Sequence, residues 1–233
     1  MFKYKKNSFM AHDMHTKKAP APNAAEPHNI FGKTAHNALC MGGKAMSNHL
    51  DYEINKELGE CYLFMGDLDK AEDYYRKAVD ASNGQASPYL GLAAIAIQRG
   101  NLENALTLYS KAASLEASDK SLTGVGLVKM ELGAHEEAFR CFAQALDYNP
   151  ENAVALNCIV REGYHLSRLE EVVSYLRACL DVAPDKEAVR VTLAGCLMSL
   201  GRNDEARSHL ESVLGDNPDN TGAQELFANI AAA

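Results

Sequence analysis

The sequence predicts an all-α chain built from helix pairs that repeat along most of its 233 residues. The stretch from Asp119 to Pro150 shows the unit most clearly. Apolar residues at helical spacing form one stripe before Gly133 and a second stripe after it, which predicts a helix, a tight turn and another helix. Asn149 and Pro150 then end the second helix, because the residue before proline avoids the α region and proline lacks the amide hydrogen that a helix interior needs.

The same unit occurs five times. When the copies are aligned on Ala138, an anchor residue recurs every 33 or 34 residues, a turn residue lies five positions before it, and a large side chain lies four positions after it. The anchors are Ala71, Ala105, Ala138, Val172 and Ala206; the turn residues are Gly66, Gly100, Gly133, Ser167 and Gly201; the large residues are Tyr75, Tyr109, Phe142, Leu176 and Leu210. The predicted copies span 52–85, 86–118, 119–152, 153–186 and 187–220, and residues 221–233 are predicted to form a capping helix.

Small residues recur where the two helices of a pair would cross. Gly59, Ala93, Gly126 and Ala194 are expected to face the anchors of their own copies. Packed helices approach to about 8–10 Å, which leaves no room for a bulky side chain at the crossing. We therefore interpret these residues as structural.

This pattern resembles the tetratricopeptide repeat, a 34-residue helix pair with small residues at the crossing and proline at the boundary. The resemblance covers the chain from Tyr52 to its C-terminus. It implies a right-handed superhelical solenoid of about five helix pairs. The fourth copy departs most from the family pattern, with Val160 at the small crossing site, Gly163 at the position of the family's mid-helix tyrosine, and Val172 as its anchor.

The N-terminal region has a different composition. Residues 1–45 are rich in Lys, His, Asn, Ala and Pro without helical or strand periodicity, which predicts a flexible basic tail. Within the region 35–50, weak helical character interrupted by two glycines suggests a partial leading helix over the first copy. His12 and His15 are the closest histidine pair in the tail, and their spacing does not favour a metal site.

Charge and hydropathy narrow the range of partners and locations. The net charge of -8 divides unevenly, because residues 1–50 hold seven lysines against Asp13 and Glu26, about +5, and the remainder carries about -13. An acidic array disfavours nucleic acid, whose phosphates need clustered Lys and Arg. No apolar run follows the N-terminal lysines and no stretch reaches about 18 apolar residues, so neither secretion nor membrane insertion is expected and a cytoplasmic location is predicted.

No pattern of catalytic residues emerges. The sequence contains no GxSxG, HExxH or P-loop motif, and the six cysteines lack metal-ligand spacing and are interpreted as reduced packing residues. The acidic pairs Glu136-Glu137 and Glu170-Glu171 fall in first turns of second helices, where carboxylates favour the helix dipole. We therefore predict that the chain is not an enzyme and takes no cofactor or metal.

The resemblance implies that the first helix of each pair lines a concave groove that binds a partner segment. The residues at the corresponding positions that are predicted to contact a partner are Lys56, Leu63, Phe64, Leu90, Ile97, Leu127, Met130, Asn157, Arg161, Tyr164, His165 and Met198. The apolar ones among them could equally be filler between repeats or a hydrophobic binding strip. Members of the family that bind chaperone tails hold a carboxylate with five polar residues. Only Lys56 and Lys120 match here, which disfavours that ligand.

These features predict a scaffold or adaptor that presents an apolar groove with acidic flanks to a protein partner. Two alternatives stay open at the level of sequence. One is a secretion-type chaperone for an aggregation-prone client, and the other is a self-assembling structural protein, so the sequence leaves a homo-oligomer open. The identity of the partner is not encoded in any recognisable motif.

Overall fold

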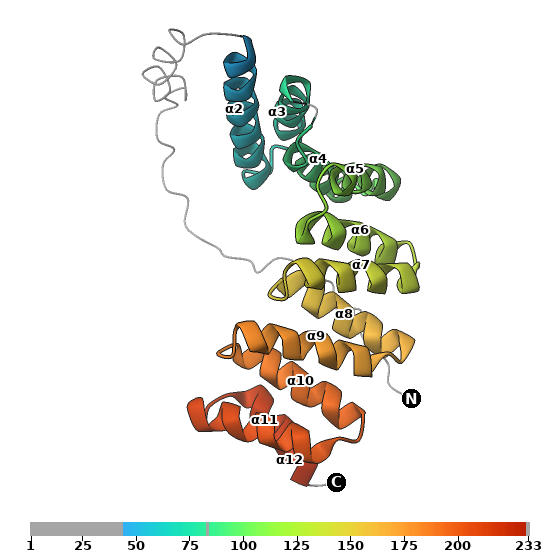
Figure 1. Cartoon of the computed structure of the whole chain (residues 1–233), viewed down its shortest axis with the longest axis vertical. Helices are drawn as coiled ribbons and strands as arrows, with labels where there is room; N and C mark the ends of the chain where they lie inside the picture. Colours follow the sequence, from blue (N-terminus) through green and yellow to red (C-terminus); the bar gives the residue numbers. More distant parts are fainter. Residues whose placement is uncertain (1–43, 83, 232–233) are drawn as a thin grey trace. The chain divides into compact units, whose positions relative to one another are not determined.

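A computed structural model describes residues 44–82 and 84–231, and within these ranges the chain forms helices and turns without strands (Figure 1). The predicted all-α fold of successive helix pairs is confirmed. The first helices of the pairs are α2 (Lys44–Phe64), α4 (Ser87–Gln98), α6 (Asp119–Glu131), α8 (Ala153–Leu166) and α10 (Glu187–Ser199). The second helices are α3 (Leu68–Ala81), α5 (Leu102–Leu115), α7 (His135–Tyr148), α9 (Leu169–Val182) and α11 (Asn203–Asp216), and α12 (Thr221–Ala231) follows them.

The predicted tail lies outside the described residues except for Lys44 and Ala45, and so do His12 and His15. Residues 44–50 form the first turns of α2, whereas the rest of the proposed leading helix is not described. The right-handed superhelix, the boundary at residue 46 and the limits of each repeat stay predictions. None of the helices in the described ranges has the length and apolar content that crossing a bilayer requires.

Each helix packs mainly on its neighbours in sequence, as expected for a repeat array. All five anchors are fully buried, including the β-branched Val172 of the fourth repeat. The largest core cluster runs from Met130 to Ile230 through the last three repeats and α12. Small residues at the anchors therefore allow the close helix approach that the sequence predicts.

Left-handed backbone closes each pair. The turn residues Gly66, Gly100, Gly133 and Gly201 have φ between 75° and 78°, and Ser167 occupies the same place with φ 58°. Glycine adopts this conformation without strain, whereas a residue with a Cβ crowds its own carbonyl oxygen there. The fourth turn is therefore the strained one of the five.

Replacing Ser167 by glycine is expected to raise the free energy of unfolding by about 0.5–1 kcal/mol, because relief of the left-handed strain outweighs the added freedom of the unfolded chain. Gly201→Ser is the matched converse and should lower it by about 1 kcal/mol. Urea unfolding followed by circular dichroism measures both. A Ser167→Gly variant that is less stable than the wild type would show that the hydroxyl stabilises the turn.

Aromatic rings from the second helices fill the space between consecutive first helices. A Cβ added at Gly91 of α4 would lie 2.2 Å from the Tyr75 ring, and one at Gly59 of α2 would lie 2.8 Å from it. Tyr109 packs in the same way against Gly124 of α6. Burial raises the pKa of Tyr75 to about 12. The two glycines thus make room for a ring that joins one repeat to the next.

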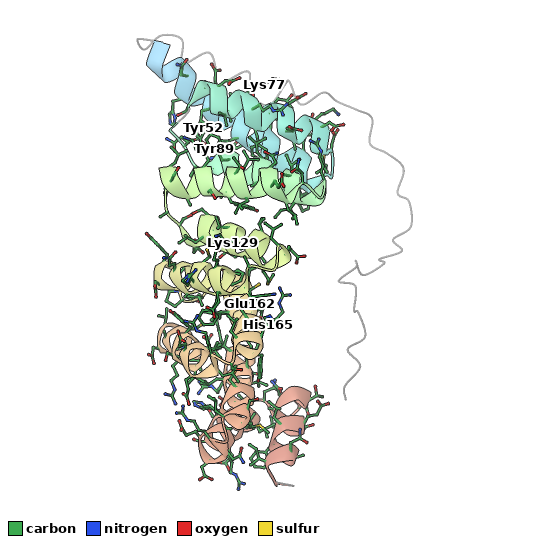
Figure 2. The ribbon with its side chains drawn as sticks, turned by 90° about the vertical axis from the view of Figure 1, so that its right-hand side faces the viewer. Tyr52, Lys77, Tyr89, Lys129, Glu162 and His165 are labelled. Carbon is green, nitrogen blue, oxygen red and sulfur yellow. The ribbon has the colours of Figure 1, made fainter. Side chains whose placement is uncertain are left out.

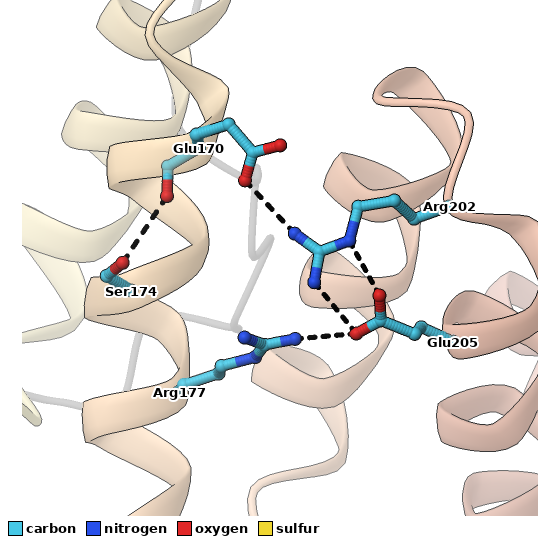
Figure 3. A network of polar contacts seen from close by, with 5 residues as sticks. All are labelled: Glu170, Ser174, Arg177, Arg202 and Glu205. Carbon is cyan, nitrogen blue, oxygen red and sulfur yellow. Dashed lines mark hydrogen bonds and ion pairs between the residues drawn. The ribbon is translucent and has the colours of Figure 1, made fainter.

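Arginines near the turns link consecutive second helices. Arg202 bonds to Glu170 of the preceding repeat at 3.0 Å and to Glu205 of its own helix at 2.7 Å and 2.8 Å, and Arg177 reaches the same Glu205 (Figure 3). Arg168 occupies the equivalent position one repeat earlier and contacts Glu136 in the same way. Arg202 lowers the pKa of Glu205. Such exposed pairs contribute little stability individually.

Candidate partner-binding surface

The residues predicted to contact a partner differ widely in exposure. Phe64 is 94% exposed at the end of α2, whereas Met130 is only 8% exposed and lies in the core. Exposed side chains also include Asn157, Arg161, Tyr164 and His165, all on α8; the partly exposed ones are Lys56, Leu63, Leu90, Ile97, Leu127 and Met198.

Most of the apolar members pack between repeats. Leu63 and Ile97 each lie against a core cluster of the first repeats, and Leu127 and Met198 lie against the large cluster of the last three. Met130 belongs to that large cluster itself. These residues therefore pack against the core, whereas Phe64 and Leu90 lie outside the core clusters.

The four exposed residues of α8 contact different neighbouring helices. The Tyr164 hydroxyl contacts the Gly195 carbonyl oxygen at 3.4 Å and Ser199 Oγ at 3.1 Å, so this side chain bridges the C-terminal halves of the two helices. Arg161 lies over the Met130 sulfur and keeps its side chain 60% exposed. Tyr164 is therefore partly structural, while Asn157 and Arg161 remain accessible.

The carboxylate of Glu162 is buried beneath the exposed residues of α8. Glu162 is 2% exposed and its Oε2 lies 2.7 Å from His135 Nδ1 of α7, while the His135 ring meets the His165 ring edge-on at 4.1 Å between centroids. Figure 2 shows Glu162 and His165 near each other on α8. Arg161 Nε lies 3.6 Å from Glu162 Oε1, so the buried carboxylate has polar partners on two residues, and the contact with His135 links α8 to α7.

The sequence prediction missed both Glu162 and His135. The column ten residues before each anchor offers the signal that could have found them, since it reads Cys61, Ile95, Val128, Glu162 and Cys196. A single glutamate in an otherwise apolar column indicates a buried charge that needs a partner. The identity of that partner, 27 residues away on another helix, is not visible in the pattern.

A pocket of about 360 Å³ opens between the N-terminal halves of α8 and α10. Its lining is mostly apolar but includes the ion pair of Lys186 with Glu151 at 2.8 Å and the acidic residue Glu187. The lining residues are Glu151, Ala153, Leu156, Asn157, Val160, Leu176, Lys186, Glu187, Ala188, Val189 and Thr192. An apolar interior with a few polar groups at its mouth is typical of a binding site. Of the predicted contact residues, Asn157 is the one that lines it.

A second cavity of about 300 Å³ lies between α3, α4 and α5. Arg99 crosses it to pair with Glu72 and with Asp69, the latter at 2.6 Å, and Arg76 also pairs with Glu72. Its charges are satisfied within the chain, which makes it a weaker candidate than the pocket between α8 and α10.

Models of the tetratricopeptide repeat match residues 53–84, 120–152 and 165–230, which together make up more than half of the sequence. The chain belongs to the tetratricopeptide repeat family. Tetratricopeptide repeat proteins generally mediate protein–protein interactions, and they are typically non-catalytic scaffolds.

Two curated tetratricopeptide-like relatives show the extent of similarity. The BBSome complex member BBS4 of Bos taurus is 32% identical over 113 residues, 48% of this chain and 22% of that protein. DnaJ homolog subfamily C member 7 of Homo sapiens is 28% identical over 190 residues, 75% of this chain and 38% of that protein. The chain thus spans well under half the length of either relative.

Solved structures support the fold. PilF of Pseudomonas aeruginosa superposes with a TM-score of 0.63 at 18% identity, covering 80% of this chain and 85% of its own. YrrB, a tetratricopeptide repeat protein with an unusual peptide-binding site, superposes with a TM-score of 0.56 at 16% identity, covering 73% of this chain and 89% of its own. At these identities the likeness concerns the fold alone.

Proposed function

We propose that this tetratricopeptide repeat chain is a scaffold or adaptor that holds a segment of a partner protein against its first helices, chiefly α8 and α10. The observation that carries the proposal is the largely apolar pocket between these helices, which also has a few polar side chains in its lining. Asn157 lines the pocket, and Arg161 extends from the next turn of α8 with most of its side chain exposed. Together they offer one apolar cavity and several hydrogen-bond donors to an extended segment.

Charge defines the class of segment. Beyond residue 50 the chain carries about -13, so basic residues in the partner are attracted and acidic ones are repelled. YrrB, the structural neighbour with a peptide-binding site, is consistent with a peptide as the ligand of such a fold. The secretion-type chaperone and the self-assembling protein stay predictions from the sequence, without a particular contact in the described helices that favours either.

A displayed library of random peptides, selected on the full chain, tests the proposed function. We expect enrichment of peptides that combine a large apolar residue with Lys or Arg. The affinity of a selected peptide should fall about fivefold to tenfold in the double variant Asn157→Ala/Arg161→Ala, because these side chains supply donors at the surface.

Arg177→Ala is the matched control, since Arg177 is an exposed arginine on the second helix α9 and should leave the affinity unchanged. Thermal unfolding of each variant verifies that it is folded. If no peptide is enriched over a blank selection, or if the double variant binds like the wild type, the proposed surface is wrong.

A further inference from the structure

The pocket between α8 and α10 arises from three substitutions that occur together in the sequence. In the first repeat the Tyr75 ring lies between Gly59 and Gly91 and so fills the space between two first helices. The equivalent residues at the junction of the fourth and fifth repeats are Leu176, Val160 and Thr192. All three line the pocket. The Leu176 side chain is shorter than the tyrosine ring and does not fill the space between the two first helices. Val160 and Thr192 are larger than the glycines that they replace and form part of the pocket lining.

The spacing of the helices agrees with this origin. The α8 and α10 helices share fewer close backbone contacts than any other two consecutive first helices of the described array. Tyr164 bridges their C-terminal halves through Gly195 and Ser199, at a position where the other repeats carry Leu63, Ile97, Met130 and Met198. The two helices are therefore bridged by Tyr164 at one end, and the space beside Leu176 at the other end is left unfilled.

The rim adds a definite electrostatic preference. Glu187 accepts hydrogen bonds from the amides of Asn217 and Asn220 at 2.9 Å and 3.1 Å, which hold it in place without neutralising its charge. Glu151 is compensated by Lys186. The pocket lining thus combines the Glu187 carboxylate, which is hydrogen-bonded to two amides, with apolar side chains, and this combination suits a cation adjacent to a hydrophobic group.

We propose that this pocket is the anchor site of the binding surface and takes one large apolar side chain, aromatic or long aliphatic, from a partner segment that places a Lys or Arg beside Glu187. This inference rests on the proposed function and specifies its ligand. The partner's side chain occupies the interval that Tyr75 occupies between the first two repeats, so the partner supplies the packing that the chain itself omits. Burial of such an anchor in a desolvated pocket is the usual source of most of the binding energy of an interface.

Filling the pocket from within tests the proposal. Ala153 and Ala188 are exposed helix residues that line it, so Ala153→Phe and Ala188→Phe should occlude it without disturbing the core. We expect each to weaken binding of a library-selected peptide by about tenfold or more, measured by fluorescence anisotropy. Ala178→Phe is the matched control, because Ala178 is exposed on α9 and does not line the pocket.

Changes in the peptide test the two halves of the ligand separately. Replacing its apolar anchor by alanine should reduce the affinity of the wild-type chain about tenfold and should have little further effect on Ala153→Phe. Replacing the adjacent basic residue by glutamine should weaken binding about threefold and reduce its salt dependence.

The failures are distinguishable. If Ala153→Phe and Ala188→Phe bind the peptide as well as Ala178→Phe does, while Asn157→Ala/Arg161→Ala still weakens binding, the surface is correct and the anchor pocket is wrong. If the selection yields no peptide, or acidic peptides that bind independently of all these variants, both proposals are overturned.

Discussion

Replacing Gly91 by threonine is expected to lower the free energy of unfolding by about 3 kcal/mol, in the upper part of the range for overpacking. A Cβ at this position would lie 2.2–2.6 Å from three atoms of the Tyr75 ring, and the ring is held between α2 and α4. Tyr75 is 2% exposed, so the ring is enclosed by its neighbours. Equilibrium unfolding in urea measures the loss.

The fifth repeat suggests how this loss can be reversed. Thr192 stands at the equivalent of Gly91 and coexists with Leu176 at the equivalent of Tyr75. Gly91→Thr/Tyr75→Leu should therefore recover a substantial part of the stability that Gly91→Thr alone loses, although Tyr75→Leu by itself is destabilising. Additive losses in this double-mutant cycle would contradict the view that the ring and the glycine share one space.

Replacing Met130 by serine is expected to lower the free energy of unfolding by about 3 kcal/mol, because Met130 is buried in the large core cluster and the change leaves a cavity lined by apolar groups. Phe64→Ser is the contrasting change at a predicted contact residue. Phe64 is 94% exposed, so its loss should alter stability by less than about 0.5 kcal/mol.

If Met130→Ser were as stable as the wild type, Met130 would be a surface residue and would again be a candidate for contact with a partner. A large destabilisation by Phe64→Ser would show instead that the end of α2 packs against other residues. Differential scanning fluorimetry of both variants gives the comparison in a single experiment.

Periodicity is sufficient to predict the fold because each repeat carries its own local signals. The turn glycines, the buried anchors and the helix pairs all follow from spacings within 34 residues, and the left-handed Ser167 lies at the position that the pattern assigns to it. Position within a helix also predicts which face is inner and which is outer. It does not predict how far a side chain on the inner face is covered by the neighbouring repeat.

The binding surface depends on that missing information. Met130 and Tyr164 occupy the same position in their repeats, yet Met130 is 8% exposed and Tyr164 is 49% exposed, so the position within a repeat does not fix the burial of a side chain. The contact of Glu162 with His135 joins two helices, and the pocket requires Val160, Leu176 and Thr192 from three. The contact and the pocket both depend on how neighbouring helices are spaced, and the sequence of a single repeat does not determine that spacing.

Amide hydrogen exchange of the full chain with and without a selected peptide tests most directly whether α8 and α10 hold the partner. Binding at the pocket should slow exchange in the N-terminal halves of these helices, over residues 153–160 and 187–192, and leave the second helices α5 and α7 unchanged. Protection confined to the second helices, with exchange in α8 and α10 unaltered by a peptide that is bound, would contradict it.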